Sequence, residues 1–299
     1  WSVLEGRVEI TVFNDHLYDI DAIAERLQPF EIVVCIRERT RFPRELLDKL
    51  PNLKLLVTGG MRNLGIDMAA AKEKGIVVCG SESFSYSTSE LTWALLLATT
   101  RNIPREVESV RNGGWQVGLG SCLHGKTLGV IGLGKQGVPV SGYAKAFGMN
   151  VIAWSQNLTA EKCAEHEVEL AASLDDLLTR ADIVTIHVVL SERTKGLIGT
   201  AQLKKMKPSA FLINTSRGPI VEEAALVTAI EAGTIAGAGL DVFDIEPMPA
   251  DHPYRRIDRI VATPHLGYTA LEGFQNFFDQ GIEDIEAWLK DAPIRIMNP

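Results

Sequence analysis

The chain has 299 residues, of which 46% are hydrophobic and 23% charged, with a net charge of −8 and a pI near 5.4. This size and apolar content suit about two globular domains with buried cores. The acidic balance and the lack of a dominant Lys/Arg block argue against a nucleic-acid partner. No apolar run reaches the ~18–20 residues that a membrane-spanning helix needs, so we also expect no membrane partner.

The N-terminus and the cysteines favour a cytoplasmic protein. The first residues, Trp1–Glu5, lack a charged segment followed by an apolar stretch, so we expect no signal peptide. Because the first residue is Trp rather than Met, we expect a native N-terminus that is missing or processed. The cysteines lie about 40 residues apart without metal-ligand spacing, which predicts reduced structural thiols and no metal site. They are Cys35, Cys79, Cys122 and Cys163.

Short apolar runs alternate with helical patterns along the whole chain, which predicts an α/β protein built on parallel sheets. In a first series we predict helices at 21–27, 43–50 and 88–101, and strands at Glu9–Phe13, Ile32–Ile36, Leu53–Val57 and Val77–Cys79. A second series predicts strands at Thr127–Ile131, Val151–Trp154, Ile183–His187, Phe211–Asn214, Ala236–Asp241 and Ile260–Thr263. The unbroken apolar runs indicate strands covered by helices on both faces.

A glycine motif follows the first strand of the second series. Gly132, Gly134 and Gly137 match GxGxxG between a predicted strand and a predicted helix, with Lys135 and Gln136 inside the motif. The three glycines suit a tight turn, a close approach to a pyrophosphate and tight helix packing, respectively. The helix N-terminus would offer N–H groups to the phosphates. The motif therefore predicts a dinucleotide site; the alternative is a glycine-rich turn without a ligand.

The segment after the next strand bears on the choice between NAD and NADP. An acidic residue there would bind the ribose 2′-hydroxyl and repel a 2′-phosphate. Here Ser155, Gln156 and Asn157 offer neither a carboxylate nor an arginine, while Lys135 adds positive charge nearby. Either cofactor is compatible with this segment, and NADP is slightly favoured.

Three polar residues follow three late strands. Arg217, Glu246 and His265 each come shortly after a predicted strand. Because ligands of open parallel sheets bind at the carboxyl ends of the strands, we expect all three side chains to lie near the glycine motif. Each also has a structural interpretation, as a surface ion pair, a loop carboxylate and a capping or core histidine.

The chemistry of these three side chains fits the reduction of a 2-oxo acid. The Arg217 guanidinium can grip a carboxylate and polarise the neighbouring carbonyl. His265 is a suitable proton donor to the carbonyl oxygen, and Glu246 would orient its ring and favour the imidazolium. The sequence therefore predicts hydride transfer between a nicotinamide cofactor and a small 2-oxo or 2-hydroxy acid.

Taken together, the motifs resemble the D-isomer-specific 2-hydroxyacid dehydrogenase family, which includes phosphoglycerate, glycerate and hydroxypyruvate enzymes. The resemblance runs from about Leu50 to the chain end and is strongest between Gly125 and Gly267. The matching segments, in family order, are Lys126–Gly134, Met206–Pro208, Ile213–Gly218, Gly237–Phe243 with Glu246-Pro247, and Thr263–Gly267.

The resemblance implies roles and architecture. It makes Arg217 a substrate ligand, His265 the acid/base and Glu246 its partner; Asp241 would contact the nicotinamide carboxamide, with Thr215 and Ser216 near the cofactor. It also implies two doubly wound domains: a Rossmann cofactor domain at 99–271, inserted in a flavodoxin-like substrate domain formed by 1–98 and 272–299. Homodimers built mainly through the cofactor domain are usual in the family.

The substrate loop departs from the family pattern. Gly60, Met61 and Arg62 stand where the family usually has two spaced glycines and binds the substrate carboxylate through the backbone, and the segment after His187 lacks the usual proline. Arg37 and Arg39 follow an early strand and would suit an anionic substrate group, although a solvated charge run is the favoured interpretation.

Two competing functions remain open at the level of sequence. A dinucleotide-sensing protein, similar to the family's corepressors, would share the scaffold, because fold alone does not fix function. A formate or phosphite dehydrogenase is disfavoured, because the formate enzymes carry Gln where this chain has Glu246.

Overall fold

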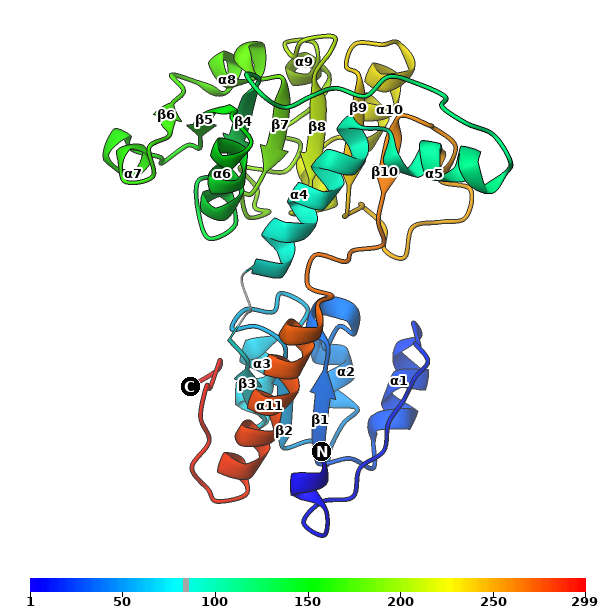
Figure 1. Cartoon of the computed structure of the whole chain (residues 1–299). Coiled ribbons are helices and arrows are strands. Elements are labelled where there is room, and N and C mark those ends of the chain that lie inside the picture. The colour runs from blue at the N-terminus through cyan, green and yellow to red at the C-terminus, as the bar shows by residue number, and fades with distance from the viewer. Residues whose placement is uncertain (83–85) are drawn as a thin grey trace. The chain divides into compact units, whose positions relative to one another are not determined.

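The computed structural model describes residues 1–82 and 86–299, and the chain forms two units (Figure 1). One unit consists of Trp1–Phe84 with Ala270–Pro299, and the other of Ser85–Thr269. Each contains a parallel sheet with helices on both faces, which confirms the predicted α/β fold class.

The unit built from the two chain ends has a three-stranded parallel sheet in the order β1-β2-β3. Successive residues of a strand point to opposite faces. Leu55 and Val57 of β2 therefore pack toward Ile285 of α11, whereas Leu56 packs toward α1, α2 and α3 on the other face. The elements are β1 Ile32–Cys35, β2 Leu55–Thr58, β3 Val77–Gly80, α1 Ile20–Leu27, α2 Arg44–Asp48, α3 Met68–Glu73 and α11 Leu271–Trp288, with 3₁₀ turns at Ser2–Leu4 and Arg37–Arg39.

The predicted strand Glu9–Phe13 is wrong: this segment has no regular secondary structure. Its alternation of polar and apolar residues resembles a strand, but Ile10, Val12 and Phe13 are all exposed. The Phe13 ring instead makes an edge contact with the ring of Phe30, and the Arg26 guanidinium lies 4.8 Å from its centre. Local packing of one aromatic ring replaces pairing with a sheet here.

The second unit contains a seven-stranded parallel sheet in the order β10-β9-β8-β7-β4-β5-β6. The strand order reverses between β4 and β7, and ligands of doubly wound sheets bind at such a point. The strands are β4 Thr127–Ile131, β5 Asn150–Trp154, β6 Glu169–Leu170, β7 Ile183–Ile186, β8 Phe211–Asn214, β9 Gly237–Leu240 and β10 Ile260–Ala262.

Helices cover both faces of this sheet (Figure 1). One apolar cluster joins α4 and α6 to Leu128 and Val130 of β4, and the other joins α8, α9 and α10 to Ile131 of the same strand. The helices are α4 Tyr86–Thr100, α5 Ile103–Arg111, α6 Gly137–Ala146, α7 Ala160–Ala164, α8 Leu174–Arg180, α9 Thr200–Leu203 and α10 Glu223–Glu231, with 3₁₀ turns at Gly218–Ile220 and Pro253–Arg255.

Helix α4 belongs wholly to the second unit. Gly239 of β9 lies so close to it that a Cβ atom there would come within 2.7 Å of Thr99 Oγ1 and 2.9 Å of Leu95 Cγ. The boundary expected between residues 98 and 99 falls inside this helix. The unit boundaries lie instead before the helix and, near the chain end, between Thr269 and Ala270.

Two general features bear on the protein's setting. Within the part of the chain that the structure describes, no helix combines the length and apolar character needed to cross a bilayer. All four cysteines are free thiols, and Cys35, Cys79 and Cys163 are buried.

Candidate active site

The carboxyl ends of six strands lie in register along one edge of the seven-stranded sheet. Ile131 pairs with Trp154 on one side and with Ile186 on the other. The alignment continues through Asn214, Leu240 and Ala262. The residues that follow these strand ends must therefore start from neighbouring points of the same edge, and they include nearly all the predicted cofactor and catalytic residues of this unit.

The glycine motif leaves β4 at this edge, and two of its glycines leave no room for a side chain. Gly132 has φ +101°, and a Cβ atom on it would lie 2.9 Å from the carbonyl of His187. A Cβ atom on Gly137 would lie 2.1 Å from the Gly132 oxygen, so the start of α6 packs directly on the turn. Gly134 has no atom within 4 Å of such a position, which leaves its backbone open to a ligand.

The surroundings of this turn fit a dinucleotide phosphate group. A pocket of about 390 Å³ lies over the turn, within the size range of small-molecule sites. The first backbone N–H groups of α6 have no partner within the helix and favour anions. Within the described residues, the Gln136 side-chain oxygen is buried without a hydrogen-bond partner. The pocket is lined by Tyr86, Leu133, Gly134, Lys135, Val138, Pro139 and Lys162.

Ser155, Gln156 and Asn157 form a turn at the end of the neighbouring strand β5. The Leu158 N–H donates to the Ser155 carbonyl at 3.1 Å, and Gln156 and Asn157 are exposed. The Gly132 N–H donates to the Trp154 carbonyl at 2.9 Å, which ties the start of this turn to the glycine motif. The turn therefore lies next to the glycine motif, and its predicted contact with the ribose stays a prediction.

A buried asparagine shapes the turn that carries Arg217. The Asn214 Oδ1 atom accepts the Ser216 N–H at 3.0 Å, and its Nδ2 atom donates to the Arg217 carbonyl at 3.0 Å. The Arg217 guanidinium donates to the Ser216 carbonyl at 2.7 Å. Asn214 is not among the predicted site residues, although asparagine at the end of a strand is a recognised signal for such turns.

Thr215 and Ser216 are held by neighbouring elements rather than left at the surface. The Thr215 hydroxyl lies 2.7 Å from the Thr92 hydroxyl of α4, and both side chains are buried. The Ser216 hydroxyl donates to the Val188 carbonyl at 2.5 Å, which links the ends of β8 and β7. Their predicted contact with the cofactor stays a prediction.

Glu246 and His265 meet across the loops that follow β9 and β10. The His265 Nδ1 atom lies 2.5 Å from Glu246 Oε2, and the Phe243 N–H donates to Glu246 Oε1 at 2.9 Å. The His265 ring also makes an edge contact with the Tyr268 ring at 5.7 Å. Because a carboxylate only accepts hydrogen bonds, Nδ1 carries a hydrogen and donates it. Nε2 is the ring nitrogen that is not engaged with Glu246.

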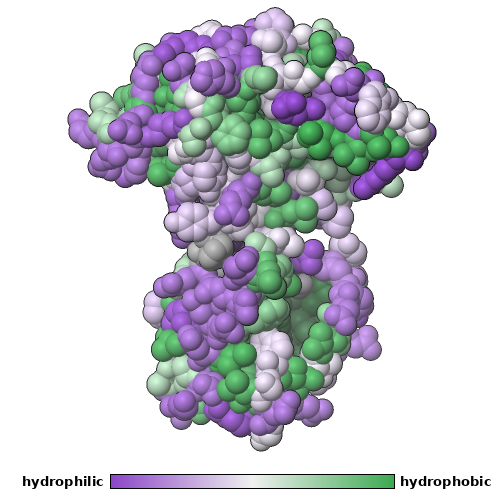
Figure 2. All heavy atoms as spheres, in the orientation of Figure 1, coloured by the Kyte–Doolittle hydropathy of each residue, from purple (hydrophilic) through white to green (hydrophobic). Residues whose placement is uncertain are grey.

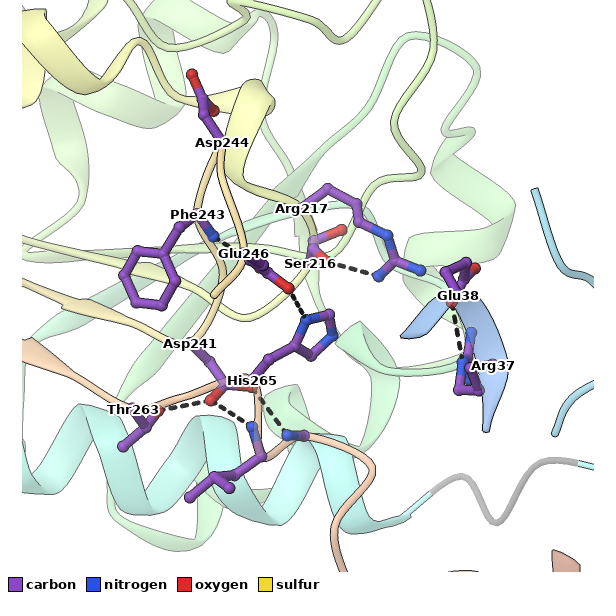
Figure 3. Close-up of polar contacts among 12 residues, drawn as sticks. Arg37, Glu38, Ser216, Arg217, Asp241, Phe243, Asp244, Glu246, Thr263 and His265 are labelled. Atoms are coloured by element: carbon purple, nitrogen blue, oxygen red, sulfur yellow. Dashed lines mark hydrogen bonds and ion pairs between the residues drawn. The ribbon is translucent and has the colours of Figure 1, made fainter. Parts of the chain in front are cut away.

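The charge of this pair follows from its surroundings. Burial raises the pKa of Glu246, but the hydrogen bond and charge of His265 outweigh it, and Arg217 adds to the lowering, so the pKa lies below its usual value. Glu246 is therefore a carboxylate at neutral pH. Figure 3 shows the His265 ring turned toward this carboxylate, with Arg217 beside the pair.

Asp241 is fully buried at the end of β9 and fastens the loop that carries His265. Its Oδ1 atom accepts the Thr263 hydroxyl at 2.6 Å and the Leu266 N–H at 2.7 Å, and its Oδ2 atom accepts the Gly267 N–H at 2.8 Å. Burial outweighs these bonds and raises the pKa of Asp241. The contact with a nicotinamide carboxamide that the family resemblance implies stays a prediction.

The backbone of His265 has φ +54°, in the left-handed region. This conformation costs roughly 1–2 kcal/mol for a residue with a side chain. The three hydrogen bonds to Asp241 on either side of His265 offset that cost. The ring is thus held by the loop that presents it as well as by Glu246.

A second histidine at the same sheet edge is unsuited to proton transfer. Burial lowers the pKa of His187 to about 4, so its ring is neutral near pH 7. Its Nε2 atom lies 3.0 Å from the Thr185 hydroxyl. His187 is therefore a poor candidate for proton transfer near neutral pH, which leaves His265 as the candidate histidine at this edge.

The predicted substrate loop lies in the other unit. The Gly60 N–H donates to the Ser81 hydroxyl at 3.1 Å, and Met61 and Arg62 are exposed. The Arg37 guanidinium lies near Gly60, 3.7 Å from where a Cβ atom would stand, and also contacts Glu38. The Arg37 side chain thus lies against the loop after β2, whereas Arg39 is the last residue of a 3₁₀ turn.

Comparisons with known proteins show the family to which the chain belongs. Residues 93–267 match the model of the D-isomer specific 2-hydroxyacid dehydrogenase family, NAD binding domain. D-3-phosphoglycerate dehydrogenase of Methanocaldococcus jannaschii is 39% identical over 255 residues, which cover 84% of this chain and 48% of that protein. Hydroxypyruvate reductase of Thermotoga maritima is 34% identical over 302 residues, which cover 98% and 94% of the two chains.

A solved structure extends the likeness to the fold of the whole chain. Phosphoglycerate oxidoreductase of Vibrio cholerae aligns with a TM-score of 0.92 and 34% identity, covering 97% of this chain and 94% of that one. The chain belongs to the D-isomer specific 2-hydroxyacid dehydrogenase family and carries its NAD binding domain. The family assignment made from sequence motifs is confirmed. The chain spans about half the length of several curated phosphoglycerate dehydrogenases that it matches.

Replacing Asp241 with Asn tests the anchoring of the His265 loop. Asparagine keeps one acceptor oxygen and presents an NH₂ group in place of the other, so at least one buried donor loses its partner. We expect the free energy of unfolding to fall by about 1–3 kcal/mol and the amides of residues 263–267 to exchange faster with deuterated water. Asp251→Asn makes the same change at an exposed position. Equal stability of the two variants would show that Asp241 does not anchor the loop.

Proposed function

We propose that the protein is an oxidoreductase that transfers a hydride between a nicotinamide cofactor and a small 2-oxo or 2-hydroxy acid. The hydroxy acid has the D configuration. The observation that carries this proposal is the 2.5 Å hydrogen bond between His265 Nδ1 and Glu246, at the sheet edge that also bears the glycine motif. A histidine held by a carboxylate through one nitrogen is set to exchange a proton through the other.

The chain's own residues would divide the work. The glycine motif, Lys135 and the Ser155–Asn157 turn would hold the cofactor, which supplies or accepts the hydride when bound. Arg217 would bind the substrate carboxylate with its planar fork and draw charge onto the carbonyl oxygen. Its carbonyl and that of Ser216 are both bound within the turn, which limits the freedom of the guanidinium.

His265 would donate a proton from Nε2 to the carbonyl oxygen during reduction and accept it during oxidation. Glu246 would keep the ring in the tautomer that carries hydrogen on Nδ1 and balance the positive charge of the doubly protonated ring. In the other unit, the backbone of Gly60, Met61 and Arg62 would bind the substrate carboxylate, and Arg37 would favour a substrate with a further anionic or polar group.

The dinucleotide-sensing alternative is less well supported. A sensor needs the cofactor site but has no use for a proton donor paired with a carboxylate and an arginine. The relatives named above are a dehydrogenase and a reductase, which also favours catalysis. Total inactivity of correctly folded protein with every 2-oxo acid and both reduced cofactors would favour the sensor.

We further propose a cytoplasmic homodimer. The four free cysteines suit a reducing compartment. Helix α5 has no buried residue, although Ile103, Val107 and Val110 share one of its sides. Trp115 and Leu119 in the following segment are 75% and 98% exposed, and Figure 2 shows apolar surface around this helix. An apolar surface of this kind is typical of an interface between copies.

Replacing His265 with Gln tests the proton donor. We expect turnover of 2-oxo acids to fall by roughly 10²–10⁴, because the amide cannot transfer the proton. The measurement is the loss of NADH or NADPH absorbance with glyoxylate, hydroxypyruvate, pyruvate and phosphohydroxypyruvate. Cofactor affinity, followed by tryptophan fluorescence, should stay unchanged. Arg217→Ala should differ by raising KM steeply. Turnover like that of the unmodified protein in His265→Gln would remove His265 from this role.

Replacing Ser155 with Asp tests the choice of cofactor. A carboxylate at the end of β5 would repel a 2′-phosphate and accept a hydrogen bond from a 2′-hydroxyl. We expect kcat/KM for NADPH to fall at least about tenfold relative to NADH. Ser155→Asn, which has the same shape without the charge, is the matched control. An unchanged ratio in Ser155→Asp would place the 2′ position of the ribose elsewhere.

Replacing Leu119 with Asp tests the dimer. A buried, unpaired carboxylate in an apolar interface is strongly unfavourable, so we expect a mass close to one chain by light scattering. Leu64→Asp changes a similarly exposed leucine in the other unit and should leave the mass at two chains. A single-chain mass for the unmodified protein would refute the proposal.

A further inference from the structure

A second pair of glutamate and histidine lies beside the candidate active site. Glu223, the first residue of α10, faces His252, which begins the 3₁₀ turn Pro253–Arg255. The His252 Nε2 atom lies 3.2 Å from Glu223 Oε2, and both side chains are largely buried. The substrate, cofactor and acid/base roles proposed above do not use either residue.

The tautomer of His252 follows from its two contacts. The Tyr254 N–H donates to His252 Nδ1 at 3.3 Å, so Nδ1 carries no hydrogen. The hydrogen must then lie on Nε2, which donates it to Glu223. The ring also makes edge contacts with Tyr254 and Phe243, at 4.6 and 6.5 Å between centres. His252 therefore bridges Tyr254 and Glu223 and is held in one orientation.

Glu223 holds both ends of the loop that contains Glu246. Its Oε1 atom accepts the N–H of Asp244 at 3.1 Å, where the loop begins, and its Oε2 atom accepts His252, where the loop ends. Burial, and next the charge of Glu223, raise the pKa of Asp244, as expected for a carboxylate close by. The positive charge of Lys195 acts in the opposite direction and does not outweigh these effects.

The start of this loop also contacts Glu246 and the turn that carries Arg217. The Phe243 N–H binds Glu246 and the next N–H along the chain binds Glu223, so two adjacent amides hold two carboxylates. Gly218, directly after Arg217, lies against the same segment: a Cβ atom there would come within 2.1 Å of the Phe243 carbonyl carbon. A shift at Phe243 and Asp244 would thus disturb Glu246 and the Arg217 turn together.

We propose that Glu223 is a positioning residue, which clamps residues 244–252 through Asp244 and His252 so that Glu246 meets the His265 ring. The proposal rests on the proposed function for its kinetic consequence. Glu223 touches neither Glu246 nor His265 in the contacts above and acts through the loop. A displacement of about 1 Å in a catalytic group can lower a rate by about 10²-fold, so the clamp matters for turnover.

The decisive experiment is a double-mutant cycle between Glu223→Ala and Glu246→Gln. We expect Glu223→Ala to lower kcat roughly 10–100-fold, with KM for the cofactor unchanged, and to lower it less than about threefold when Glu246 is already Gln. Glu231→Ala, an exposed change at the other end of α10, should leave kcat unchanged. An equal loss from Glu223→Ala in both backgrounds, or no loss in either, would overturn the proposal.

Two variants of His252 separate its contact with Glu223 from its contact with the Tyr254 N–H. They also test the proposal if Glu223→Ala fails to fold. His252→Gln keeps a donor that can reach Glu223, so we expect turnover within about threefold of the unmodified protein. His252→Asn keeps an acceptor for the Tyr254 N–H but is too short for Glu223, so we expect the loss seen in Glu223→Ala. Equal turnover of the two variants would count against the clamp.

The turnover of the unmodified protein distinguishes failure of the proposed function from failure of the clamp. If it turns over none of the 2-oxo acids, the function is refuted, and the clamp is then judged by the ring signals of His265 in NMR. These signals report the contact with Glu246 without turnover. We expect them to shift in Glu223→Ala and His252→Asn but not in Glu231→Ala. Unshifted signals in all three variants would refute the clamp.

Discussion

The register of the seven-stranded sheet is the constraint on which the site depends. Parallel strands that are hydrogen-bonded in register end at the same edge, whatever their distance along the chain. Ile131, Ile186, Asn214, Leu240 and Ala262 occupy matching positions, so the glycine motif and the turns of Arg217, Glu246 and His265 start side by side. Loops of only a few residues are then enough to bring together three side chains that are far apart in the chain.

Two carboxyl groups at this edge, those of Asp241 and Glu246, have pKa values shifted in opposite directions by their surroundings. Asp241 is fully buried and accepts three hydrogen bonds from the loop of His265, and burial still raises its pKa. Glu246 is one-third exposed, and its contact with the His265 ring lowers its pKa despite burial. The first carboxylate holds the backbone of the His265 loop, and the second remains charged opposite the ring that we propose as the proton donor.

The sequence predicted the parts of the fold that depend on local pattern. Buried parallel strands are apolar on both faces, and six of the seven strands of the second unit were located to within one or two residues. The two-residue edge strand β6, which is not buried, was not predicted. Glu9–Phe13 has the alternation of a strand but lies exposed, because alternation does not reveal whether a partner strand is present. The boundary expected after residue 98 missed the packing of α4 on β9, where Gly239 admits Thr99 and Leu95.

The candidate site divides in the same way. Arg217, Glu246 and His265 were predicted because each has a chemical role and follows a strand. The pair Glu223 and His252 was not predicted, because its role arises only from contacts between loops. Asn214 bonds within its own turn, and the turn signal at the end of its strand could have identified it. A polar residue that binds the backbone of a distant loop has no motif by which the sequence alone would identify it. Its partner, a particular N–H or carbonyl group, is set by the fold.

Burial separates the residues that hold the site from those that would meet the substrate. Asp241 and Asn214 are at most 1% exposed, whereas the side chains of Glu246 and His265 are each 33% exposed. A buried hydrogen-bonding group is costly to leave unpaired, so changes to the first set act mainly on stability. Changes to the second set leave few buried groups unpaired and act mainly on the reaction. His252 and Glu223, with side chains 13% and 24% exposed, lie between these limits, so changes there should affect both stability and rate.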